Sequence, residues 1–149
     1  MLACAAAAQG QAVLLVIEET LNGTPLPPPF ASHEGIAAAL FDDGVIVLDL
    51  PGGSAADPAQ LSRTAVSAGA DYVLSVTVDY AASGGSAPHF DAHAAFRLFA
   101  VPDGPPLVQS TADGTNKGRE RAVDREGLGD ELGRAVAAKA WAALSRAAR

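Results

Sequence analysis

Hydrophobic residues follow two strand-like spacings along this sequence. The runs at 12–17 (AVLLVI) and 45–50 (VIVLDL) are almost continuously apolar and rich in β-branched residues, which is typical of strands buried on both faces. Residues 72–80 and 89–100 instead alternate between apolar and mostly polar side chains, as strands with one exposed face do. A shorter strand is expected at 107–111, after a turn rich in proline and glycine. We therefore expect five strands, the first two in central positions.

Helical spacing occurs at three places, twice between strands and once after the last strand. Ser32 is the expected N-cap of a helix that ends before Gly44. Asp57 and the proline after it predict the start of a second helix, which ends at Gly69 because glycine tolerates the positive φ of a helix C-terminus. The third helix covers roughly residues 128–147 and carries one apolar stripe, with its acids early and its bases late, as the helix dipole favours.

The remaining segments are expected to be connections. Glu19 and its neighbours should carry the first strand out into solvent. Residues 112–126 are polar without a period, which predicts an exposed segment. Gly127 and Gly129 are expected to delay the start of the last helix.

The predicted element order is β-α-β-α-β-β-β-α. Helical crossovers need parallel neighbours and a meander needs antiparallel ones, so the sheet is mixed. The polar faces of the alternating strands place the three helices on one face of a five-stranded sheet. The expected fold class is thus α/β (α+β), a two-layer sandwich. Residues 1–11 are expected to be a signal remnant or flexible tether, and residues 12–149 a single α/β domain.

The charge balance argues against nucleic acid as a partner. Ten lysines and arginines stand against seventeen aspartates and glutamates, a formal net charge of −7, and no basic stripe is present to neutralise phosphates. No apolar run is long enough to span a membrane. The sequence has one cysteine, which excludes a disulfide within the chain and a cysteine metal cluster. We expect no cofactor.

The position of that cysteine suggests a compartment. Met1-Leu2-Ala3-Cys4 resembles the last residues of a bacterial lipoprotein signal, in which a small residue precedes the cysteine that becomes lipidated. The charged and apolar regions of such a signal do not precede it here, so this start would be a truncated one. Cys4 is the candidate lipidation site, and a lipid anchor there would be the chain's contact with a membrane.

Three further stretches carry a resemblance to a known family. They are ETLNG at 19–23, FDDGVIVLDL at 41–50, and the junction A-x-x-x-G-A-D-Y-V-L-S-V-T-V at 65–78. From Ala12 to Ala147 the chain resembles the α/β domain shared by several bacterial envelope proteins. These are the amino-terminal domain of the Tol-system propeller protein, the curli secretion lipoprotein, flagellar assembly protein T and the lipoprotein activators of penicillin-binding proteins. The resemblance implies a periplasmic or outer-membrane-anchored domain without catalytic residues, which binds other envelope proteins or copies of itself.

Polar side chains on the alternating strands are the candidate interaction surface. The residues expected to share the exposed sheet face are Ser75, Thr77, Asp79, Asp91, His93 and Arg97. With all helices on one face, half of the side chains of the two apolar strands would lack a cover. This further predicts an interface on the exposed face, which a homo-oligomer could provide. The plainer interpretation of these polar residues is a solvated face.

An enzymatic alternative uses some of the same residues. Asp79, Asp91 and His93 could converge to hold a divalent metal, and Ser54 follows a strand and precedes a helix, as the nucleophile of a small hydrolase does. The second glycine of the nucleophile motif is replaced by Ala56. We therefore favour a non-enzymatic envelope domain over a small hydrolase or metal-binding enzyme.

Overall fold

The computed structural model describes residues 11–50, 57–85, 88–102, 104–119 and 123–147. Within these residues one sheet is formed by β1 (Ala12–Leu21), β2 (Thr24–Pro25), β3 (Ile46–Asp49), β4 (Tyr72–Ser83), β5 (His89–Ala100) and β6 (Pro106–Thr115). The helices are α1 (Ala31–Asp42), α2 (Pro58–Ala68) and α3 (Arg125–Ala147). The predicted order of elements is confirmed, with the two-residue strand β2 added to it.

The sheet is mixed, as predicted. β1 runs parallel to β3 and β4, while β4, β5 and β6 form an antiparallel meander. β2 and β3 both pair with the same side of β1, β2 near its end and β3 near its start. The architecture is an open α/β sandwich.

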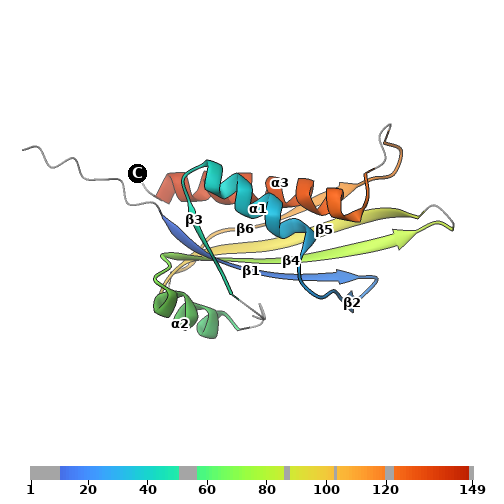
Figure 1. Ribbon diagram of the computed structural model, residues 1–149. Helices are drawn as coiled ribbons and strands as arrows, with labels where there is room; N and C mark the ends of the chain where they lie inside the picture. The colour runs from blue at the N-terminus through green and yellow to red at the C-terminus, as the bar shows by residue number, and fades with distance from the viewer. Residues whose placement is uncertain (1–10, 51–56, 86–87, 103, 120–122, 148–149) are drawn as a thin grey trace, which may run out of the picture.

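The three helices do not share one face of the sheet, which corrects the expectation from the sequence. α1 and α3 cover one face and α2 lies on the other (Figure 1). Val13 and Leu15 of β1 pack in the core beneath α1 and α3, whereas Leu14 and Val16 pack with Leu61 of α2. The two apolar faces of β1 are therefore covered by different helices.

The handedness of the crossovers explains this arrangement. From β1 the chain crosses through α1 to β3, on one side of β1, and then through α2 back to β4 on the other side. Parallel crossovers are right-handed in nearly all proteins. Two right-handed crossovers in opposite directions along a sheet place their helices on opposite faces.

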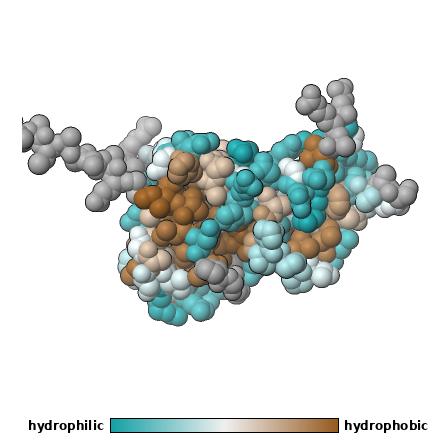
Figure 2. Space-filling view, in the orientation of Figure 1, coloured by the Kyte–Doolittle hydropathy of each residue, from teal (hydrophilic) through white to brown (hydrophobic). Residues whose placement is uncertain are grey.

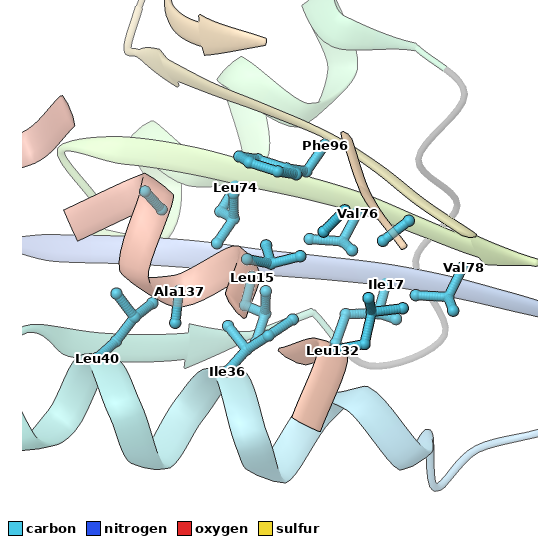
Figure 3. Packing of buried hydrophobic residues seen from close by; sticks show 14 of the residues in the cluster. Leu15, Ile17, Ile36, Leu40, Leu74, Val76, Val78, Phe96, Leu132 and Ala137 are labelled. Carbon is cyan, nitrogen blue, oxygen red and sulfur yellow. The ribbon is translucent and has the colours of Figure 1, made fainter. Parts of the chain in front are cut away.

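The larger core lies between the sheet and the helix pair α1 and α3. Figure 3 shows Leu15 and Leu74 pointing from the sheet toward Ile36 and Leu40 of α1. The two helices approach closely because glycines face their contact. A Cβ added at Gly133 would meet the carbonyl oxygen of Ser32, and one added at Gly35 would meet that of Asp130.

α3 begins earlier than predicted. Gly127 and Gly129 were expected to delay it, but both lie inside the helix, which starts at Arg125. An added Cβ at Gly129 would meet the hydroxyl of Tyr80 and the side chain of Ala31. Gly129 is thus a packing position, where the absence of a side chain lets the helix reach the sheet.

β3 is an edge strand, not the central strand that its apolar run predicted. Among the described residues it pairs only with β1, and Ile46 is half exposed. Val47 contacts the larger core, whereas Leu48 contacts the smaller one beside α2. The apolar run therefore indicates contact with both layers, which an edge strand can also have.

β6 is longer than predicted, since it continues to Thr115. The expected exposed segment at 112–126 was wrong in this part, because Ala112 is buried and Asp113 pairs with His93 on β5. Asn116 then closes the strand by accepting a hydrogen bond from the Phe90 amide.

Glu19, not Ser32, caps α1. Glu19 is 2% exposed, contrary to the expected exit into solvent, and its carboxylate accepts hydrogen bonds from the Ser32 amide at 2.9 Å and the Ser32 hydroxyl at 2.7 Å. The guanidinium of Arg125 lies 3.9 Å from the same carboxylate and stacks over the Tyr80 ring. A carboxylate at a helix N-terminus satisfies free amides and interacts favourably with the helix dipole. Burial, reinforced by the Glu19 charge, raises the pKa of Tyr80.

Candidate protein-binding surface

α2 covers only one end of the sheet face on which it lies, the face opposite α1 and α3. Beneath it lie Val73 and Phe99 together with the β1 residues Leu14 and Val16. Farther along the strands the same face carries mostly polar side chains. We call this uncovered part the open face and define it by residues of four strands. They are Glu18 and Thr20 of β1, Ser75, Thr77 and Asp79 of β4, Asp91, His93, Ala95 and Arg97 of β5, and Gln109, Thr111, Asp113 and Thr115 of β6.

One row of polar residues crosses all four strands of the open face. The register aligns Thr20 with Asp79, Asp79 with His93, and His93 with Asp113. The Thr20 hydroxyl donates a hydrogen bond to the Asp79 carboxylate at 2.6 Å, and a ring nitrogen of His93 contacts the Asp113 carboxylate. Polar side chains that pair across strands stabilise a sheet modestly. These side chains also line a shallow depression.

A second depression lies closer to α2. Ser75 pairs with Arg97 in register, and Arg97 pairs with Gln109, so a second row spans three strands. The guanidinium of Arg97 lies 5.9 Å from the centre of the Phe99 ring, which orients it along the sheet. Both depressions are open, and Tyr80, Ala81 and Ala92 line the first one beside its polar row.

The six residues proposed from the sequence thus lie on one face of the folded chain. The register pairs Tyr80 with Ala92, two residues away from the expected pairing near Phe90, so Asp79 is opposite His93, whereas Asp91 lies opposite Ala81 and Thr115. The sequence analysis does not include Asp113 and Thr115 in this face, because it predicts an exposed connection at 112–126. The alternation of Thr111, Ala112 and Asp113 was the signal that could have extended the strand.

The enzymatic alternative finds little support in this geometry. Asp79 accepts a hydrogen bond from Thr20 and His93 contacts Asp113, so two of the three proposed metal ligands already have partners across the strands. In the part of the chain that the structure describes, no three His, Cys, Asp or Glu side chains form a group that could hold a metal ion. Ser54 and Cys4 lie outside the described residues.

Comparison with known proteins places the fold. No protein-family model matches this sequence, and no curated protein matches it either. Solved structures do match. PelC from Paraburkholderia phytofirmans, described as a dodecamer, is 23% identical over 85% of this chain and 86% of its own, with a TM-score of 0.60. Lipoprotein GNA1162 from Neisseria meningitidis is 20% identical over 87% and 96% of the two chains, with a TM-score of 0.52.

The C-terminal domain of LpoB from Salmonella enterica matches as well, at 18% identity over 70% of this chain and 82% of its own, with a TM-score of 0.50. The chain has a bacterial lipoprotein-like fold. The coarser part of the family resemblance is thereby confirmed, while the likeness to the Tol, curli and flagellar proteins stays a prediction. Among the helices described, none has both the length and the apolar character required to cross a bilayer.

Proposed function

We propose that this chain is a non-enzymatic domain of the bacterial cell envelope that binds other proteins through its open face. The fold supports the compartment, since bacterial proteins that include a lipoprotein share it over most of their length. The formal net charge of −7 disfavours nucleic acid as a partner, in agreement with a protein partner.

The observation that carries the proposal is the open face itself. Four neighbouring strands carry polar side chains in register, and apart from the buried Ser75 these side chains are exposed or partly exposed. A broad sheet surface crossed by rows of charged and hydroxyl side chains matches the composition of protein interfaces, which resemble the rest of a protein surface in polarity.

Two further features belong to the same proposal. A lipid on Cys4 would anchor the domain to the outer membrane. This part of the proposal rests on the Leu2-Ala3-Cys4 pattern alone, because Cys4 lies outside the described part of the chain. Copies of the chain would also associate with one another. The description of the PelC structure as a dodecamer supports self-association in this fold.

Cross-linking in cells tests the proposal. A photoreactive amino acid in place of Thr77, on the open face, should give cross-links to another envelope protein when the full chain is expressed in its native host. The same amino acid in place of Glu34, an exposed residue of α1, is the matched control and should give few. Recovery of the chain in the cytoplasmic fraction, or equal cross-linking from both positions, would refute the proposal.

A further inference from the structure

An apolar patch lies on the edge of the molecule formed by α1 and β3. Phe41, at the end of α1, is 74% exposed, and Ile46, at the start of β3, is 52% exposed. Figure 2 shows hydrophobic residues gathered over this part of the surface. Single exposed apolar residues are ordinary, but two large ones on consecutive elements at a sheet edge indicate a contact surface.

Acidic residues accompany the patch. Asp42 and Asp43 directly follow Phe41 and are exposed, and Asp49 lies at the other end of β3. Among the described residues β3 has no strand on its outer side, so its backbone edge is open as well. We call Phe41, Asp42, Asp43 and Ile46 the acidic edge. A partner for this surface needs positive charge and room for an aromatic ring.

The exposed side of α3 has both properties. Its bases from residue 133 onward are Arg134, Lys139 and Arg146, and this part of the described helix contains no acid. Arg134 pairs with Asp130 one turn earlier at 3.2 Å, so Lys139 and Arg146 carry most of the positive charge of this surface. Between the three bases lie the exposed alanines Ala135, Ala138 and Ala142, whose small side chains leave the helix surface flat. The ammonium of Lys139 donates a hydrogen bond to the Thr111 carbonyl at 2.6 Å, which holds positive charge at the outermost strand β6. We call this surface the basic face.

We infer that the acidic edge of one copy of this chain binds the basic face of a second copy. The inference rests on the proposed function in that it takes protein binding as the task of the domain. Phe41 and Ile46 would pack on the alanines, while Asp42 and Asp43 would face the bases. A symmetric contact between two acidic edges would instead bring like charges together, which is unfavourable.

The two surfaces lie on different parts of one molecule. α3 packs beside α1 and over β5 and β6, and its exposed bases lie on the side turned away from these contacts, whereas β3 is at the opposite edge of the sheet (Figure 1). A contact between unlike surfaces is head-to-tail, and it builds a ring when its rotation closes or a filament when it does not. Each copy in the assembly therefore uses both surfaces while its open face stays available to another protein.

Sedimentation velocity on the full chain tests the inference. The wild-type protein should form species larger than a monomer, and Phe41→Asp should weaken their association by at least about thirtyfold, the effect of losing a hot-spot residue. Ala142→Glu, which keeps a good helix former but adds bulk and an acid to the basic face, should have a similar effect. Val66→Asp is the matched control, since Val66 on α2 is 53% exposed and belongs to neither surface.

A mixture of the two defective variants provides the sharper measurement. The Phe41→Asp chain keeps its basic face and the Ala142→Glu chain keeps its acidic edge, so together they should form a one-to-one dimer that grows no further. A wild-type chain that stays monomeric at every concentration, or a mixture that stays monomeric, overturns the inference. Cross-linking from position 77 to another envelope protein would persist in that case, so failure here and failure of the proposed function are distinguishable.

Discussion

A single buried carboxylate joins three elements of this fold. The side chain of Glu19, a residue of β1, accepts hydrogen bonds from the first residues of α1 and lies beside Arg125 at the start of α3. The sequence suggested the opposite for this residue, because two consecutive glutamates at the end of an apolar run are usually solvated. The role of Glu19 depends on where α1 begins in space, and the spacing of residues along β1 carries no information about that position.

Glu19→Gln should therefore destabilise the chain by about 2 kcal/mol, since it removes charge-assisted hydrogen bonds and a charge at the helix N-terminus. Urea denaturation of the full chain measures this change. Glu34→Gln is the control, because Glu34 lies in the same first turn of α1 but is exposed. It should change the free energy of unfolding by no more than about 0.5 kcal/mol. Equal effects of the two substitutions would show that Glu19 is not a structural charge.

Tyr80 gives the fold a pH dependence in alkaline solution. Burial raises the pKa of its phenol in the folded state, whereas the unfolded chain has the ordinary value near 10. Above about pH 10 the unfolded state loses this proton first, so the free energy of unfolding falls as pH rises, with a contribution approaching about 1.4 kcal/mol per pH unit. Tyr80→Phe should make this decline shallower in urea titrations between about pH 9 and pH 11. Parallel curves for the two proteins would contradict this assignment.

At the scale of elements, residue spacing predicted what forms but not where it lies. The alternation of apolar and polar residues predicted β4 and β5, and the capping residues predicted both ends of α2. The structure confirms these elements. The side of the sheet that α2 covers depends instead on the direction in which the chain crosses β1. Spacing also cannot distinguish an edge strand from a central one when, as in β3, helices contact both of its faces.

The contact between α1 and α3 depends on glycines that a helix would otherwise disfavour. Gly133→Ala should raise helix propensity by about 1 kcal/mol, yet the added Cβ would meet the Ser32 carbonyl and push the helices apart. We expect a net loss of about 2 kcal/mol in the free energy of unfolding, measured with urea, as overpacked cores show. Gly85→Ala is the control, because nothing lies within 4 Å of a Cβ added there. A stabilised Gly133→Ala protein would contradict the close packing described here.

At the scale of the whole molecule, the candidate surface was predictable in part. Alternation placed Ser75, Asp79, His93 and Arg97 on one face before the register was known, since strand periodicity alone decides this. Predicting that this face extends onto β6 requires knowledge of the strand pairing. Predicting which part of the face α2 covers requires knowledge of the topology.

The most direct measurement is the yield of cross-links from position 77 in cells, compared between the wild-type background and one carrying Asp79→Lys with Arg97→Glu. Both substituted residues border the cross-linker on the open face, and their reversal leaves the cores intact. A partner bound to this face should be lost, so the yield should fall at least about tenfold, as for the loss of roughly 1.4 kcal/mol of binding. An unchanged yield in the reversed background would contradict the claim that this domain acts by binding protein through its open face.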